Sequence, residues 1–408
     1  MMIVLASDQL ATDPSHRGLH ARKKLVCNKV TDIFARSRWL QLNVFKQSYN
    51  PYRVVVLSSD FVRIDGSQGE GGGQILRTAI SLSAITGKPV EVDNIRARRP
   101  NPGLRPQHMT AIKVLSDLFH AGVENLQVGA ERVRFAPSAG RFEGGSLKVD
   151  VGTAGSIPMI LMAVVPAVSL SNNSLQLEVI GGTDVKASPT MDYVRHIVVE
   201  AYRSIGVKFS ADVVKRGYYP KGGGIVRAEI EPCREPSTIE LLNSRSLEPK
   251  ITSVCSQLPK HVAERQISSA LVALEKRGVS CSNYTASFET SLSPGTSILI
   301  YSISDFGGPY VGGDSIGELG KRAEAVGAEA AERFLESSLA KVPVDPFLAD
   351  MLVMPLALAK GRSKYRIVRV SEHLQTNLQV ARQIAECKYS IEQSDANRSY
   401  VVTIENND

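Results

Sequence analysis

The sequence predicts an α+β fold made of three repeated units, each with two helices on a four-stranded sheet, together with an inserted smaller α+β domain. Two observations carry this prediction. A pattern of helix, strand, helix and paired strands occurs three times, and a long segment of different pattern separates the second occurrence from the third. The chain of 408 residues is also too long for one small core. Three such units would form a body with pseudo-threefold symmetry.

The first unit occupies residues 69–95, 106–122 and 144–152. It begins with an apolar helix and continues into "KPVEVDNI", where apolar residues alternate as in a strand with one buried face. Its second helix, "MTAIKVLSDLF", places Ile112, Leu115 and Leu118 on one stripe. The strand "GGSLKVDVG" is expected to complete this unit.

The other two units follow the same plan. The second occupies residues 154–180, 188–206 and 222–232, and the third occupies 347–370, 371–387 and 399–406. Between them, the break "EPCREPS" opens a segment with strands and two helices of its own, which reads as an inserted domain. The expected organisation is a basic extension (1–60) that is either disordered or not native, repeats one and two (61–237), the insert (238–341) and repeat three (342–408).

Composition excludes several classes of protein. The five cysteines are scattered without a C-x-x-C pair, which indicates neither a zinc site nor a disulfide framework and favours the reducing cytoplasm. No apolar run is long enough to span a membrane. The net charge is +7, but residues 1–60 hold nine Lys/Arg against four acids and supply most of it. The net charge therefore says little about a nucleic-acid partner, and that inference must rest on local clusters of charged residues.

Alignment of the units places two histidines at equivalent positions. The second helix begins at "PQHM" in unit one and at "SEHL" in unit three, so His108 and His373 both fall at predicted helix N-termini. Free N–H groups and the positive end of the helix dipole make such a position an anion site. A histidine there is biased toward the neutral imidazole, the form that can act as a nucleophile.

Three loops carry further candidate residues. "DGSQGEGGGQILRT" is a glycine-rich turn before a helix, which suits either a plain turn or close approach to a ligand, with Glu70 available to a cation. "NIRARRPNPGLRPQH" holds four arginines on a loop stiffened by prolines, a pattern that favours phosphate binding. "GYYPKGGGIV" presents Tyr218, Tyr219 and Lys221, and reads equally well as a glycine turn between strands or as an RNA or nucleotide contact. Hydrolase and kinase motifs are missing from the sequence.

At these residues the chain resembles the RNA 3'-terminal phosphate cyclases. The motifs "DGSQGEGGGQILR", "RPNPGLRPQH", "GTAGS", "GGTD", "GYYPKGGG" and "SEHLQTN" stand in that family's order over about residues 61–408. The resemblance implies an enzyme that uses ATP to convert an RNA 3'-phosphate to a 2',3'-cyclic phosphodiester. His373 matches the nucleophile, which would attack the ATP α-phosphate and hold AMP before AMP passes to the RNA end.

The resemblance also implies the remaining site residues. Glu70 matches a residue that contacts the divalent cation, Mg or Mn. The residues matched to phosphate and RNA-end binding are Arg77, Arg96, Arg99, Gln107 and His108. Those matched to the ATP pocket are Pro189, Asp350, Met162, Phe347 and Met351. Met162, Phe347 and Met351 depart from the family, whose well-known members have glutamine, tyrosine and glutamine there, so apolar groups replace polar groups that could read the edge of the base.

Two alternatives remain open. One is a catalytically inert, cyclase-like protein that serves ribosome assembly as an RNA or protein platform, although such relatives lack the histidine that His373 matches. The other is a transferase that shares only the repeated architecture, like the enolpyruvyl transferases, which carry six units. The partner implied is RNA with a 3'-terminal phosphate, with no membrane role and no indication of oligomeric state.

Overall fold

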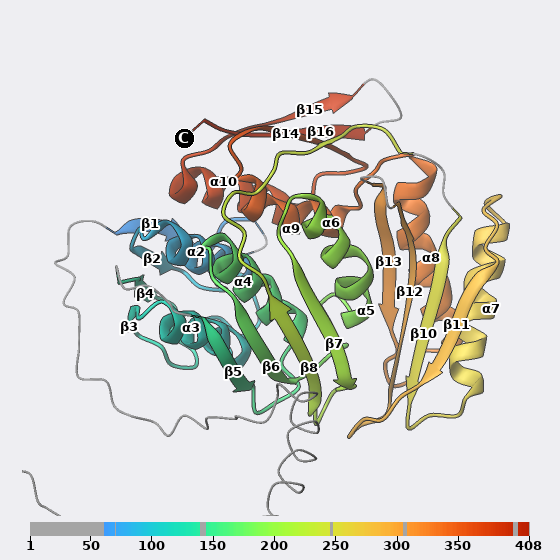
Figure 1. Ribbon diagram of the computed structural model, residues 1–408. Helices are drawn as coiled ribbons and strands as arrows, with labels where there is room; N and C mark the ends of the chain where they lie inside the picture. Colours follow the sequence, from blue (N-terminus) through green and yellow to red (C-terminus); the bar gives the residue numbers. More distant parts are fainter. Residues whose placement is uncertain are drawn as a thin grey trace, which may run out of the picture. The chain divides into compact units, whose positions relative to one another are not determined.

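The computed structural model describes residues 61–69, 71–138, 144–244, 248–304, 308–394 and 399–407. The extension expected over residues 1–60 lies outside this part, as does Glu70. The described chain is a mixed α+β protein with four four-stranded sheets and helices packed against them (Figure 1).

The first sheet contains four short strands. In spatial order they are β1 (Val62–Asp65), β2 (Val90–Asp93), β4 (Val133–Ala136) and β3 (Gly122–Glu124). β1 and β2 are parallel, whereas β2 with β4 and β4 with β3 are antiparallel. The helices of this unit are α2 (Gly73–Thr86) and α3 (Pro106–Leu118), and both present buried apolar residues on one side, as expected for helices that cover a sheet.

The second sheet repeats this strand order. Its strands are β5 (Gly145–Asp150), β6 (Leu175–Gly181), β8 (Gly224–Ile230) and β7 (Phe209–Lys215). Its helices are α4 (Ile157–Leu170) and a second helix that runs through α5 (Met191–Tyr193), the π-helical turn η1 (Val194–Val198) and α6 (Val199–Ser204).

The expectation that residues 144–152 complete the first unit is wrong, because β5 pairs in parallel with β6, with Val149 opposite Val179. Pairing of this kind depends on a partner distant in sequence, which the local pattern does not reveal.

The third sheet has the same order again. Its strands are β9 (Glu240–Leu241), β14 (Gly361–Ile367), β16 (Ser399–Asn406) and β15 (Lys388–Ser394). The first two are parallel and the others antiparallel, as in the two sheets before it. The helices are α9 (Pro346–Leu356) and α10 (Glu372–Ala385).

Between β9 and α9 the chain forms a fourth sheet with a different order. The strands are β11 (Asn283–Phe288), β10 (Lys250–Ser256), β12 (Gly295–Ile303) and β13 (Tyr310–Ile316). The helices α7 (His261–Glu275) and α8 (Ala323–Leu339) pack on this sheet and on one another. They enclose a separate apolar cluster that includes Ile267, Ile298 and Phe334.

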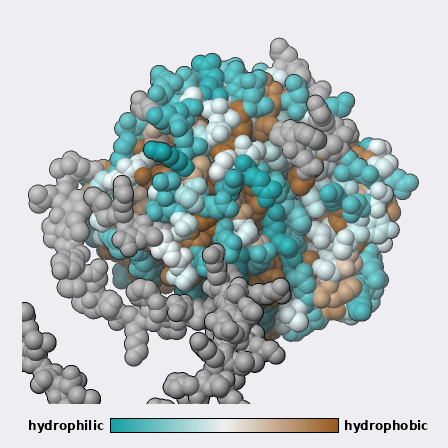
Figure 2. Space-filling model, in the orientation of Figure 1, coloured by the Kyte–Doolittle hydropathy of each residue, from teal (hydrophilic) through white to brown (hydrophobic). Residues whose placement is uncertain are grey.

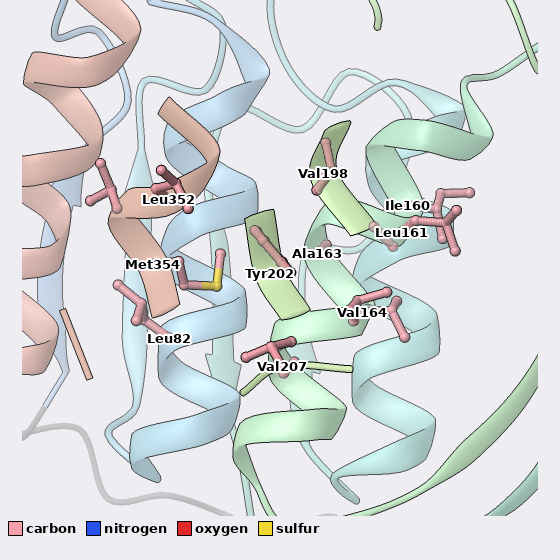
Figure 3. Packing of buried hydrophobic residues seen from close by; sticks show 14 of the residues in the cluster. Leu82, Ile160, Leu161, Ala163, Val164, Val198, Tyr202, Val207, Leu352 and Met354 are labelled. Carbon is pink, nitrogen blue, oxygen red and sulfur yellow. The ribbon is translucent and has the colours of Figure 1, made fainter. Parts of the chain in front are cut away.

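Helices of the first three units share the main apolar core. Figure 3 labels Leu82 of α2, Val164 of α4 and Leu352 of α9 among the side chains of one buried cluster, and each is at most 1% exposed. Burial of one such side chain contributes roughly 1.5–3 kcal/mol. The shared core holds α2, α4, α9 and α10 together as one body, and with them the loops at their N-terminal ends.

Candidate active site

A pocket of about 760 Å³ lies among these helices. It is lined from all three units and from the insert. Of the residues expected in the site, it contains His373, Arg77, Arg96, Arg99, Gln107, His108, Pro189, Phe347, Asp350, Met351 and Met162. Glu70, expected at the cation, lies outside the described residues. Residues from units far apart in sequence therefore meet in one cavity.

His373 is held at the first turn of α10. The helix is capped by Ser371, whose hydroxyl oxygen accepts from the Leu374 N–H at 2.9 Å and whose O–H donates to Asp350 Oδ1 at 2.6 Å. His373 is thus the second helical residue, and serine does the capping, as its short side-chain oxygen favours. The imidazole is partly exposed to the pocket. The positive end of the helix dipole at this first turn favours an anion.

His108 occupies the start of α3 in a different way. It is 2% exposed, and its Nδ1 accepts from the Arg105 N–H at 3.3 Å. A Cβ atom added at Gly73 would lie 2.1 Å from His108 Nε2, so the ring packs directly on the first residue of α2. Burial, followed by the positive charges of Arg77, Arg96 and Arg105, lowers the pKa of His108 to about 3. His108 is therefore a neutral imidazole at physiological pH.

An arginine cluster forms one wall of the pocket. Burial and the neighbouring Arg96 lower the pKa of Arg77 to about 10, and burial with Arg105 and Arg99 lowers the pKa of Arg96. Within the described part of the chain, no carboxylate pairs with Arg77 or Arg96, and the buried Arg96 Nε has no hydrogen-bond partner there. Like charges that depress one another's pKa, with an unsatisfied donor among them, favour a bound anion.

The glycine-rich loop before α2 passes between this cluster and His373. Arg98 Nη1 donates to the Gly69 carbonyl at 2.7 Å. A Cβ atom at Gly72 would lie 3.3 Å from Arg99 Nη2 and 3.8 Å from His373 Cε1. Gly69 has φ +54°, and a Cβ atom there would lie 2.7 Å from Thr376 of α10. Glycine is required because the backbone approaches α10 this closely. The loop therefore places backbone atoms next to the candidate nucleophile.

Another wall is apolar. Four methionines line it, two from α4 and two from α9, together with the half-exposed ring of Phe347 and with Pro189. Nearby polar side chains donate to backbone carbonyls of α9: the Tyr202 hydroxyl to that of Met351 at 2.9 Å, and Asn377 Nδ2 to that of Asp350 at 3.0 Å. This wall suits a flat apolar group better than a charged one.

The insert supplies a wall that the sequence did not indicate. Lys321 and Arg333 both pair with Glu329, and Arg333 Nη1 also donates to the Asp314 carbonyl at 2.6 Å. Lys186 pairs with Glu318 at 2.9 Å and so links the second unit to the insert at the pocket. Lys321, Glu329 and Arg333 lie in the insert, and no spacing in the sequence indicates that they line the same pocket as His373.

The described residues contain no cluster of three His, Cys, Asp or Glu side chains that could hold a metal ion. None of their helices combines the length and apolarity that a bilayer crossing requires.

The chain is similar to proteins of known name. A family model described as RNA 3'-terminal phosphate cyclase matches residues 68–391. Proteins named RNA 3'-terminal phosphate cyclase are 41% identical in Pyrobaculum aerophilum, over 81% of this chain and 94% of that one, and 42% identical in Pyrococcus furiosus, over 78% and 92%. The solved enolpyruvyl transferase NikO of Streptomyces tendae matches 83% of this chain and 47% of its own with 7% identity and a TM-score of 0.35, from which nothing follows. On the family match and the sequence identities, this chain belongs to the RNA 3'-terminal phosphate cyclase family.

Proposed function

We propose that this protein uses ATP to convert an RNA 3'-phosphate to a 2',3'-cyclic phosphodiester through a histidine–AMP intermediate. One observation carries the proposal: His373 is partly exposed at a helix N-terminus, in a pocket that also holds Arg77 and Arg96, which pair with no carboxylate of the described residues. A nucleophile, an anion site and a positively charged wall are the parts that transfer of a nucleotidyl group requires.

In the first step, a neutral imidazole nitrogen of His373 attacks the α-phosphorus of ATP. The N–P bond forms as the bond to the bridging oxygen breaks, and pyrophosphate leaves with the electron pair. The positive dipole end at the start of α10 is suited to the charge that develops on the α-phosphate. Arg77, Arg96 and Arg99 are suited to the departing phosphates.

In the second step, an oxygen of the RNA 3'-phosphate attacks the phosphorus of the AMP group, and the P–N bond breaks to regenerate His373. In the third, the neighbouring 2'-hydroxyl attacks the activated 3'-phosphate, loses its proton and releases AMP. Activation is needed because a phosphate monoester is a poor electrophile. Ring closure then proceeds within one molecule, where proximity lowers the barrier.

A divalent cation would depend on Glu70 and on the phosphates themselves. Mg²⁺ is commonly held by one or two carboxylates together with substrate phosphates, and Glu70 would be such a carboxylate. When bound, it would neutralise charge on the triphosphate. The residues of the pocket remain responsible for binding and orientation.

The apolar wall is proposed to take the adenosine. Pro189, Phe347 and the methionines Met162 and Met351 present apolar surface to a flat base, and Asp350 lies among them. The common strand order of the three sheets supports, in addition, a repeated unit arranged about a pseudo-threefold axis.

The intact mass of the protein after incubation with ATP and magnesium tests the proposal. We expect an increase equal to one AMP, and conversion of RNA ending in 3'-phosphate but not in 3'-hydroxyl. Arg99→Ala should slow turnover of the phosphorylated RNA by about 10- to 150-fold, the equivalent of roughly 1.5–3 kcal/mol for a charged hydrogen bond. A protein that binds RNA without ever acquiring AMP would instead be the inert platform.

A further inference from the structure

The turn between β7 and β8 holds an aromatic side chain in solvent. Tyr218 is 4% exposed and packs on Gly295, where a Cβ atom would lie 2.1 Å from the ring. Its neighbour Tyr219 points the other way and is 79% exposed, and Lys221 is exposed beside it. The motif "GYYPKGGG" was predicted to be either a structural turn or an RNA contact. Tyr218 is buried and fits the first interpretation, whereas the exposed Tyr219 fits the second.

The turn is held firmly on both sides. The Gly222 N–H donates to the Tyr218 carbonyl at 2.8 Å, and the Lys221 N–H donates to Ser293 Oγ at 3.2 Å. A Cβ atom at Gly222 would lie 2.7 Å from the Thr153 carbonyl oxygen, and one at Gly223 would lie 2.4 Å from Leu292. The backbone on either side of Tyr219 is therefore held in place, which lowers the cost of ordering the turn when a contact is made there.

A short path connects this turn to the pocket. The last residues of β5 and β7 and the first residues of β8 lie at the same end of the strands of the second sheet, as Figure 1 shows. Residues 152–155 follow β5 at that end, and Gly152 and Thr153 are exposed. The Ser156 N–H donates to Gln107 Oε1 at 3.4 Å, and a Cβ atom at Gly155 would lie 3.3 Å from Gln107 Cβ. Gln107 lines the pocket, so Tyr219 is reached from it through one exposed segment of small residues.

Resting on the proposed function, we infer that single-stranded RNA leads away from the pocket along this path. The 3'-phosphate lies at the arginine cluster, the chain crosses residues 152–155, and a base upstream stacks on Tyr219 while Lys221 meets a phosphate. Aromatic rings are sequence-tolerant platforms for unpaired bases, and lysine complements the backbone charge. Small residues on the path allow the sugar–phosphate chain to approach the protein closely. Figure 2 shows hydrophilic residues interspersed with apolar ones on the face in view.

Fluorescence anisotropy without ATP tests the path independently of chemistry. A labelled, unpaired RNA of about ten nucleotides, near the size that one single-strand site covers, is compared with a dinucleotide, both ending in 3'-phosphate. Tyr219→Ala should weaken binding of the longer RNA by about 5- to 150-fold, the range for one lost base stack, and leave the dinucleotide within about twofold. Tyr219→Phe should restore most of the affinity, because the ring remains.

Tyr284→Ala is the matched control. Tyr284 is also an exposed tyrosine, at 54%, but it lies on β11 of the insert and none of the contacts along the path involve it. It should leave both affinities unchanged. The inference is overturned if Tyr219→Ala binds the longer RNA as the wild type does, or if it loses both RNAs equally. A wild type that binds RNA along this path yet forms no AMP adduct would refute the proposed function alone.

Discussion

The starts of α3 and α10 place a histidine in nearly the same position and give it opposite surroundings. His108 is buried against Gly73, accepts a backbone hydrogen bond and has a pKa of about 3. His373 follows a serine cap and is partly exposed in the pocket. Both histidines therefore lie at the positive end of a helix dipole, and the difference between them comes from burial. Only the ring that a substrate can reach is suited to form a covalent bond.

The largest expected effect separates the two histidines directly. His373→Ala should abolish the AMP adduct and the ATP-dependent reaction, because the attacking nitrogen is gone. His108→Ala should still form the adduct, even if transfer to RNA slows. Intact mass after incubation with ATP measures both, and thermal unfolding confirms that each variant folds. AMP that remains attached to His373→Ala through an acid-labile bond would reverse the assignment, with His108 the first residue to examine.

Two adjacent glycines sharpen the comparison at the level of packing. Gly73→Ala places a Cβ atom 2.1 Å from the His108 ring, which is buried and cannot withdraw, so overpacking should cost roughly 1–3 kcal/mol of unfolding free energy. Gly72→Ala meets only the end of the Arg99 side chain, at 3.3 Å, and should cost less. Chemical denaturation of both variants gives the difference. Equal losses would mean that His108 can move aside.

The pKa of His108 predicts a dependence of stability on pH. Its folded value of about 3 lies below the ordinary value of 6.5, so the unfolded chain binds the proton more readily. The stability associated with the neutral ring is complete above pH 6.5 and falls as the pH drops toward 3. Between pH 7 and 5 the loss from this group should be about 2 kcal/mol.

Comparison with His108→Asn isolates that contribution. The variant has no imidazole to protonate, so its unfolding free energy should change less between pH 7 and 5 than that of the wild type. Parallel curves for the two proteins would show that His108 is solvated enough to titrate normally.

The smallest expected effect concerns the cap of α10. Ser371→Ala removes the hydroxyl that accepts from Leu374 and donates to Asp350, and should cost about 1 kcal/mol. Ser390→Ala, whose hydroxyl bonds Glu392 at the surface, is the control and should change stability little. If Ser371→Ala also lowers the rate of adduct formation more than stability explains, the cap helps to orient His373.

Much of this comparison could be predicted from sequence. Local patterns indicated both helix starts, since capping residues, prolines and apolar periodicity act within a few residues. The cap itself was open to prediction, because Ser371 stands before the helix and serine caps better than histidine. The four arginines on a loop stiffened by prolines also indicated an anion site, and Arg96 and Arg99 of that loop line the pocket.

What could not be predicted depends on contacts between distant segments. The burial of His108 comes from Gly73 on another helix, and nothing near "PQHM" distinguishes it from "SEHL". The wall formed by Lys321, Glu329 and Arg333 arises from how the insert packs, which no local pattern encodes. The prediction that placed β5 in the first unit was wrong for the same reason. Its pairing with β6 is set by register across the sheet.

The short strand β9 has a consequence for how the chain folds. Its pairing joins Glu240 to Lys364, whereas the matching pair in the first sheet joins Val62 to Val90. Closing the longer loop costs more chain entropy, and contacts between distant segments slow folding. The insert shortens the effective loop once it has collapsed on its own apolar cluster. The third sheet should therefore close last, and the helix that bears His373 would reach its final place only when the rest of the molecule is already assembled.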